Sequence, residues 1–219
     1  MKPRIQFVQI PPMPIEKGSR FKSVVEHPFF AWIGFRSPIA QHTSAEHETL
    51  MRYARASLTV VEIGVAEGAS AAGLREAMPP QGTLYLVDPF HLSRVPALNF
   101  LKRAAQRAVA AAGSSHIVWI EAFSHDAVRD WNRSIDFLLI DGDHQERAVE
   151  QDWRDWSPFV SSGGVVAFHD AREFPSGWAS SSYGPVRFIN RFFRSGQSTP
   201  WVILEEVDSL VFVSRKKFS

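Results

Sequence analysis

The stretch that decides the fold is residues 135–170, IDFLLIDGDHQERAVEQDWRDWSPFVSSGGVVAFHD. Two apolar runs in it, residues 135–140 and 163–168, end abruptly in acidic and imidazole side chains. Between them lies a helix-like segment of the length that a crossover between parallel strands needs. Ligands of open parallel sheets bind just beyond the carboxyl ends of the strands. We therefore expect five polar side chains at one pocket edge: Asp141, Asp143, His144, His169 and Asp170.

Strand-like and helix-like segments alternate over the rest of the chain. Apolar, β-branched runs predict strands at residues 57–65, 83–88, 116–123, 135–141 and 165–170. Stretches of helical pattern predict helices at residues 43–55, 66–78, 97–112, 144–156 and 186–193. Residues 201–216 are typical of two strands joined by a tight turn at Glu206 to Ser209. The alternation predicts a doubly wound α/β fold whose mostly parallel, seven-stranded sheet is closed by an antiparallel hairpin.

The first 42 residues differ from the rest of the chain and are expected to form a proline- and aromatic-rich extension. The domain itself is expected to span residues 43–219. Proline at this density argues against long regular elements. The extension carries an aromatic patch of Phe29, Phe30, Trp32 and Phe35. Exposed, such a patch would be costly, so we expect it to be buried against the domain or against a second copy in a homo-oligomer.

Composition excludes several classes of function. The net charge is +1, with 24 Lys and Arg against 23 Asp and Glu, so nothing favours a nucleic acid or an anionic membrane as partner. The chain has no cysteine, which excludes disulfides, thiolate metal sites and a cysteine nucleophile. No apolar run approaches the length of a membrane span or of a secretion signal. We therefore expect a cytoplasmic protein.

The first expected strand leads into a glycine turn, in the sequence VVEIGVAEGAS of residues 60–70. Gly64 and Gly68 would let the backbone approach a ligand closely, and the helix that follows offers free N–H groups. The dinucleotide fingerprint fails here, because its middle glycine is replaced by Ala66. By itself this turn is a weak signal for any one ligand.

Two acidic residues near this turn narrow the choice of ligand. Glu62 precedes the turn, where a carboxylate repels a pyrophosphate and suits a cationic group such as an ammonium. Asp88 ends the second strand, where its side chain can accept hydrogen bonds from two ribose hydroxyls. Together they fit a ligand with a ribose, no phosphate and a positively charged amino-acid end. S-adenosylmethionine has all three properties.

On these motifs the chain resembles the class I S-adenosylmethionine-dependent methyltransferases. The blocks EIGVAEGAS, LVD, IDFLLIDGDH and SSGGVVAFHD carry the resemblance, which covers residues 43–214. The last two blocks are similar, more narrowly, to the macrocin O-methyltransferase and cephalosporin-hydroxylase-like branch. The resemblance implies that the cofactor is bound by Glu62, Gly64, Ala66, Gly68, Ser70, Asp88, Phe123, Ser124 and Asp141.

The resemblance also implies a divalent metal, Mg²⁺ or Mn²⁺, held by Asp141, His169 and Asp170. It further implies His144 or Asp143 as the general base. His169 departs from the acidic pair that is frequent in this branch. Mg²⁺ prefers oxygen ligands, whereas a histidine-containing set favours Mn²⁺, Fe²⁺ or Zn²⁺, or the protein binds no metal.

The expected function is therefore O-methylation of a hydroxyl on a small molecule. The resemblance implies a sugar or a glycosylated natural product as the acceptor. One alternative is a metal-independent methyltransferase with His144 or Asp143 as an unaided base. Alternatives of another class are a nicotinamide-dependent oxidoreductase, against which Ala66, Glu62 and the terminal hairpin count, and a non-catalytic protein that binds the cofactor.

Overall fold

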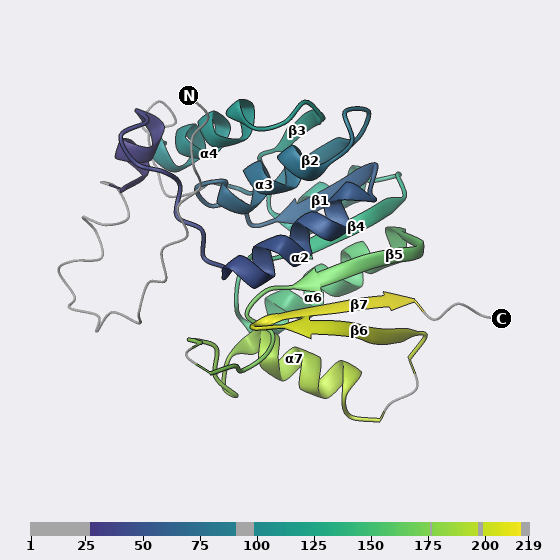
Figure 1. The fold of residues 1–219 in the computed structure, drawn as a ribbon. Helices are drawn as coiled ribbons and strands as arrows, with labels where there is room; N and C mark the ends of the chain where they lie inside the picture. The colour runs from purple at the N-terminus through teal and green to yellow at the C-terminus, as the bar shows by residue number, and fades with distance from the viewer. Residues whose placement is uncertain (1–26, 91–98, 176, 197–198, 216–219) are drawn as a thin grey trace.

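A computed structural model describes residues 27–90, 99–175, 177–196 and 199–215 (Figure 1). Its centre is a seven-stranded sheet in the order β3-β2-β1-β4-β5-β7-β6. The strands are β1 (Thr59–Ile63), β2 (Thr83–Val87), β3 (His116–Ile120), β4 (Ile135–Ile140), β5 (Val160–Phe168), β6 (Trp201–Val207) and β7 (Leu210–Arg215). The first five pair in parallel, and β7 is antiparallel to both β5 and β6. The predicted fold class is confirmed.

Helices cover both faces of this sheet. The first group is α2 (Ser44–Arg55), α3 (Ala69–Ala77) and α4 (Phe100–Ala111). The second group is α5 (Ser124–Ala127), α6 (Glu146–Trp156) and α7 (Gly184–Phe193), with the 3₁₀ turns η2 (Val128–Asp130) and η3 (Ser157–Phe159). No helix in the described ranges is long and apolar enough to cross a membrane.

The inner strands are apolar on both faces because each face is buried under helices. In β4, Phe137 and Leu139 pack in the hydrophobic cluster with α2, α3 and α4. Leu138 and Ile140 alternate with them and pack in the cluster with α6 and α7. The apolar pattern stops where the strand leaves the two helical layers, so the next residue, Asp141, lies at the carboxyl edge of the sheet.

Several element boundaries differ from the sequence prediction. Strand β5 begins at Val160 instead of Val165, and a register shift against β4 absorbs the extra residues around Gly163, whose φ is +87°. Helix α7 begins at Gly184, two residues earlier than expected, because Pro185 fits the first turn of a helix. Strands β1 and β3 end before the predicted residues 65 and 123. The short helices after β3 were not predicted, and the predicted start of α4 at residue 97 lies outside the described residues.

Glu46 in the first turn of α2 connects this helix to the turn between β6 and β7. It forms a capping box with Thr43, whose backbone N–H donates to Glu46 Oε2 over 2.7 Å. The other carboxylate oxygen accepts from the backbone N–H and the hydroxyl of Ser209, at 2.7 and 2.6 Å, in the turn between β6 and β7. Ser209 in turn accepts at its carbonyl from Ala171 and Arg172, just after β5. The side chain of Glu46 is fully buried.

We expect Glu46→Ala to lower the free energy of unfolding by about 2–4 kcal/mol, since a buried acceptor of three hydrogen bonds is removed and Ser209 loses its partner. Urea denaturation followed by circular dichroism measures the change. Glu48→Ala, an exposed position on the same helix, is the matched control and should change it by less than about 0.5 kcal/mol. Equal effects in the two variants would contradict the role of Glu46.

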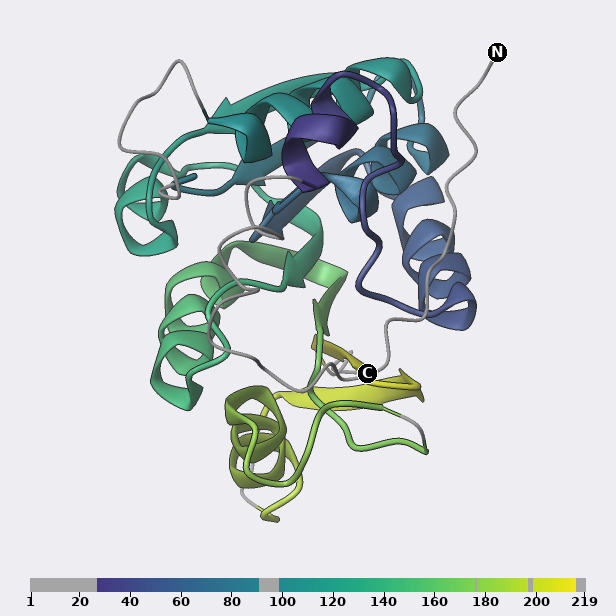
Figure 2. The same ribbon diagram turned by 90° about the vertical axis from the view of Figure 1, so that its left-hand side faces the viewer.

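The described part of the extension, residues 27–42, lies against the domain. Figure 2 looks onto the carboxyl edge of the parallel strands, and the purple segment crosses this side of the molecule. Phe29 and Trp32 are half-buried and pack on Phe100 of α4, with ring centroids 5.1 and 5.6 Å apart. Phe35, by contrast, is 82% exposed. Phe29 and Trp32 therefore pack against the domain as expected, whereas Phe35 does not, and its burial against a second copy of the chain stays a prediction.

Candidate active site

A cavity of about 670 Å³ opens at the carboxyl edge of the sheet, within the usual size range of small-molecule sites. Its wall is built from the glycine turn after β1, the loops after β2, β3 and β4, one side of α6, and the extension. A second hollow of about 520 Å³ lies beside Trp131 and contains none of the predicted site residues. The larger cavity is therefore the candidate active site.

The glycine turn brings the loops after β1 and β4 into close contact. Gly64 has φ +88°, and a Cβ atom there would lie 2.1 Å from the carbonyl oxygen of Asp141, so no other residue fits without a shift. Ala66 also has a positive φ, +47°, at the position of the missing glycine. Asp88 stabilises this conformation, because its Oδ2 accepts from the N–H groups of Val65 at 2.8 Å and Ala66 at 3.2 Å.

These bonds add a role for Asp88 that the sequence did not suggest. Its carboxylate lines the cavity at the end of β2, as expected, and also holds the turn in place. Contact with a ribose stays a prediction.

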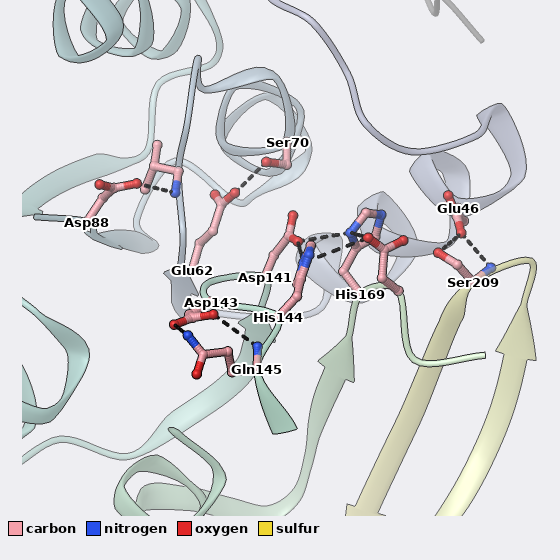
Figure 3. A network of polar contacts seen from close by, with 12 residues as sticks. Glu46, Glu62, Ser70, Asp88, Asp141, Asp143, His144, Gln145, His169 and Ser209 are labelled. Carbon is pink, nitrogen blue, oxygen red and sulfur yellow. Dashed lines mark hydrogen bonds and ion pairs between the residues drawn. The ribbon is translucent and has the colours of Figure 1, made fainter. Parts of the chain in front are cut away.

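Glu62 lies behind the cavity wall and is fully buried. One of its carboxylate oxygens accepts from the hydroxyl of Ser70, and the other has no hydrogen-bond partner among the described residues (Figure 3). Burial raises the pKa of Glu62 well above its usual value; the bond from Ser70 opposes this shift, and the charges of Asp141 and Asp88 add to it. Ser70 lines the cavity, so Glu62 acts on a ligand there through Ser70.

Four of the five polar residues predicted from residues 135–170 come together. His169 Nδ1 lies 2.9 Å from Asp141 Oδ1, and His144 Nε2 lies 3.5 Å from the same oxygen (Figure 3). Asp170 Oδ2 lies 3.7 Å from each of these two imidazole nitrogens. His169 and Asp170 are 3% and 2% exposed, so most of the cluster is buried, and His144 is its most exposed member.

The acidic and imidazole groups of this cluster stabilise one another's charged forms. Burial opposes the charged form of His169, but the carboxylates of Asp141 and Asp170 outweigh burial and raise its pKa. Burial likewise opposes the charge of Asp141, and the nearby His169 and His144 nevertheless hold its pKa below the usual value. The pKa of His144 is raised, because Asp141 and Asp170 outweigh its burial. Without a ligand, Asp141 and His169 therefore form an ion pair.

Asp143, the fifth residue, turns toward the start of α6. Its carboxylate accepts from the backbone N–H of Gln145 at 3.0 Å and from the side-chain amide of Gln145 at 3.2 Å (Figure 3). The bond from the N–H two residues on forms an Asx turn directly before α6, which begins at Glu146 with Gln145 as its N-cap. Asp143 still borders the cavity, but outside the cluster.

The cluster fits a divalent cation. The ligand atoms of Asp141, His144 and His169 all lie within 4.8 Å of one another. Two ligands about 2.1 Å from one ion are roughly 3.0–3.4 Å apart, close to the 2.9 and 3.5 Å separations observed here. Three buried polar atoms have no hydrogen-bond partner among the described residues: His144 Nε2, His169 Nε2 and Asp170 Oδ1. Two imidazoles with carboxylates suit Mn²⁺, Fe²⁺ or Zn²⁺ better than Mg²⁺.

The backbone at Asp170 is unusual. Its φ is +51°, in the left-handed region that a non-glycine residue rarely adopts. The next two N–H groups donate to the carbonyl of Ser209, at 2.9 and 3.1 Å, which holds the chain in this conformation. Strain of this kind collects at functional positions.

Sequence reasoning missed part of the cavity wall. Ile39, Gln41 and His42 of the extension line the cavity, and Glu67 of the glycine turn holds this segment. Glu67 accepts from His27 Nδ1 at 2.9 Å and from the backbone N–H of Ile39 at 3.0 Å. The irregular, proline-rich extension has no periodicity from which these contacts could have been read.

The comparisons with known proteins agree with this geometry. Residues 61–171 match the sequence model of a family described as a methyltransferase domain, and the chain belongs to this family. The uncharacterized protein R132 of Acanthamoeba polyphaga mimivirus is 26% identical over 149 residues, which are 66% of this chain and 64% of that protein. The chain thus spans a little under two thirds of the length of this relative.

Three solved structures share the fold. The O-methyltransferase TomG from Streptomyces achromogenes, involved in tomaymycin synthesis and solved with SAM, has a TM-score of 0.60 at 17% identity, over 90% of this chain and 94% of that one. An O-methyltransferase from Bacillus cereus, solved with SAH, has a TM-score of 0.57 at 16% identity, over 94% and 93%. The SAH-bound methyltransferase PaMTH1 of Podospora anserina has a TM-score of 0.56 at 12% identity, over 96% and 100%. At these identities the likeness concerns the fold alone.

Proposed function

We propose that this protein is an S-adenosylmethionine-dependent O-methyltransferase that acts on a hydroxyl of a small molecule. The observation that carries the proposal is one cavity shared by two features. Its wall contains the glycine turn, which lies within the residues that match the methyltransferase family, and its edge contains Asp141 and His144 of the cluster. A methyl donor and an acceptor can therefore meet in one place.

We place the donor on residues that line the cavity. In the proposed binding mode, the methionine end lies over Gly64, Ala66 and Ser70, and Glu62 acts on it through the hydroxyl of Ser70. Gly68, predicted at the same site, does not line the cavity and instead packs against Ala105 of α4, where a Cβ atom would lie 2.8 Å from Ala105 Cα. The ribose lies at Asp88, and Phe123 and Ser124 border the adenine. Asp141 lies at the methionine end, so the reactive methyl group faces the cluster.

The protein has two tasks in this reaction, which are alignment and removal of a proton. The donor's methyl carbon is already electrophilic, but an acceptor hydroxyl is too weak an acid to ionise at neutral pH. His144 is the base that we favour, because its Nε2 faces the cluster whereas Asp143 is engaged by Gln145. A divalent cation held by Asp141, His169 and Asp170 would supply positive charge that acidifies the hydroxyl and offsets the carboxylates beside His144.

The acceptor that we propose is a vicinal diol, such as a sugar of a glycosylated natural product. This choice rests on the resemblance of residues 135–144 and 161–170 to the macrocin O-methyltransferase branch. The cavity has room for a small molecule beside the donor. The proposed acceptor is neither a nucleic acid nor a membrane lipid, in keeping with the balanced charge of the chain.

Cofactor identity is the direct test of the proposed function. S-adenosylhomocysteine should stabilise the protein by about 2.7 kcal/mol at a hundredfold excess over its Kd, read as a rise in melting temperature. NADH and NADPH at equal concentration should have no effect, because Ala66 replaces the middle glycine of the dinucleotide fingerprint. Stabilisation by NADH alone would identify an oxidoreductase. Binding of S-adenosylhomocysteine without turnover on any diol would favour a non-catalytic protein.

A further inference from the structure

Asp170 is a proposed metal ligand whose carboxylate is not held in place by hydrogen bonds to the cluster. Its Oδ1 has no hydrogen-bond partner among the described residues. Its Oδ2 lies 3.7 Å from an imidazole nitrogen of His144 and of His169, which is longer than a hydrogen bond. The side chain is nevertheless only 3% exposed. The direction in which this carboxylate points therefore depends on the backbone that carries it.

The backbone at Asp170 is held from outside β5. A φ of +51° costs a non-glycine residue on the order of 1–3 kcal/mol, so neighbouring contacts have to maintain it. The N–H groups of Ala171 and Arg172 donate to the carbonyl oxygen of Ser209, at 2.9 and 3.1 Å. Ser209 lies in the turn between β6 and β7, and the pairing of β7 with β5 brings this turn beside the end of β5. The position of Ser209 therefore sets the course of the chain just after Asp170.

Helix α2 in turn holds this turn at two points. Glu46 Oε1 accepts from the backbone N–H and the hydroxyl of Ser209, at 2.7 and 2.6 Å (Figure 3). The hydroxyl of Thr43, the N-cap of α2, donates to Asp208 Oδ2 over 2.6 Å. Glu46 and Ser209 are both fully buried, so water does not replace their bonds when these are lost. A carboxylate of α2 thus fixes the turn, and the turn fixes the chain after Asp170.

We infer that Glu46 is a positioning residue for the proposed metal centre, and that it acts through Ser209 to hold the Asp170 carboxylate in the orientation that binds the cation. The inference rests on the metal centre proposed above. When Glu46 is removed, the turn is no longer held, and Asp170 can relax to a negative φ that turns its carboxylate away from the other ligands. Groups that orient metal ligands without touching the metal change its affinity by about 10–100-fold when they are lost.

The test measures the dissociation constant of Mn²⁺ by electron paramagnetic resonance, in the wild type and in Glu46→Ala, at a temperature at which circular dichroism shows each protein to be folded. Glu46→Ala should weaken Mn²⁺ binding by about tenfold or more. The affinity for S-adenosylhomocysteine should stay within about threefold of the wild type, because Glu46 and Ser209 do not line the cavity.

Arg75→Ala is the matched control for lost stability. Arg75 also takes part in three hydrogen bonds, which it donates to the carbonyl oxygens of Val109, Ala110 and Ser115 between the end of α4 and the start of β3. This variant should unfold more easily than the wild type and keep its Mn²⁺ affinity. Should Glu46→Ala not fold, Ser209→Ala replaces it. Ser209→Ala removes one of the two bonds to Glu46 and should weaken Mn²⁺ binding by about threefold or more.

Unchanged Mn²⁺ affinity in the folded variant would overturn the inference, and so would an equal loss of affinity in Arg75→Ala. Wild-type protein that binds no Mn²⁺ would overturn it together with the metal centre. If that protein still binds S-adenosylhomocysteine and methylates a diol, the proposed methyltransferase function stands without a metal.

Discussion

His144→Ala should lower the rate of methyl transfer by a factor of about 10²–10⁴, the usual contribution of a general base. The imidazole Nε2 lies at the open side of the cluster, 3.5 Å from Asp141 Oδ1, and has no hydrogen-bond partner among the described residues. It is therefore placed to accept a proton from a hydroxyl bound there. The measurement is the initial rate of S-adenosylhomocysteine formation with a panel of vicinal diols, glycosides among them.

Asp143→Ala tests the rival base. Because Asp143 is occupied at the start of α6 by Gln145, its loss should weaken the helix start and lower the rate far less than the loss of His144. Calorimetry with S-adenosylhomocysteine should give unchanged affinity in His144→Ala, which separates a lost base from a damaged cofactor site. A large rate loss in Asp143→Ala with none in His144→Ala would exchange the two roles. Full activity in both variants would remove the proposed base.

Removal of divalent cations should abolish methyl transfer and leave cofactor binding nearly intact. Donor atoms of Asp141, His169 and Asp170 converge at the edge of the cavity, with His169 Nδ1 2.9 Å from Asp141 Oδ1 and 3.7 Å from Asp170 Oδ2. The glycine turn that we propose to hold the donor contributes none of these atoms. Asp141→Asn and Asp170→Asn should behave like the chelator. Binding of Mn²⁺, followed by electron paramagnetic resonance, supplies a readout independent of turnover and should be lost in both variants.

The metal experiment has a clear contrary result. Full activity in the presence of a chelator would leave His144 as an unaided base and the ion pair of Asp141 with His169 as a structural feature. Glu173→Gln is a matched control, because this acidic residue follows β5 closely but binds the backbone of Ser181 instead of the cluster. It should keep wild-type Mn²⁺ binding. Loss of Mn²⁺ binding in this control as well would mean that the cation binds elsewhere.

The order of strands and helices was predictable because it depends on local pattern. The mainly apolar, β-branched runs at residues 60–63 and 135–140 are typical of buried strands, and the crossover between the fourth and fifth strands has the length of a helix. Boundaries were less predictable, since they depend on partners distant in sequence. Strand β5 extends back to Val160 because Ile135 of β4 pairs with it there, and no pattern within residues 160–164 announces that pairing.

Part of the candidate site was predictable from the sequence and part was not. Parallel strands end at one edge of a sheet, so it was predictable that three residues at strand ends would lie close together: Asp141, His169 and Asp170. That Asp143 would not join them depended on competition with a helix start, and that His144 would sit within 3.5 Å of Asp141 depended on the path of the loop. The contributions of Ile39 and Gln41 to the cavity could not be predicted, because Glu67 holds that segment through contacts that leave no periodicity in the sequence.

The sequence by itself determined the sheet, its crossovers and the chemical identity of the residues at its carboxyl edge, since hydrophobic periodicity and strand-end position are local properties. Only the tertiary structure decided the protonation and the orientation of those residues. Three features depend on groups brought together across the fold. They are the burial of Glu62, the ion pair of Asp141 with His169, and the hydrogen bonds that join Glu46 to Ser209 and Ser209 to the chain after Asp170. Burial and charge proximity are properties of the packed molecule, and they set which side chains can hold a cation or accept a proton.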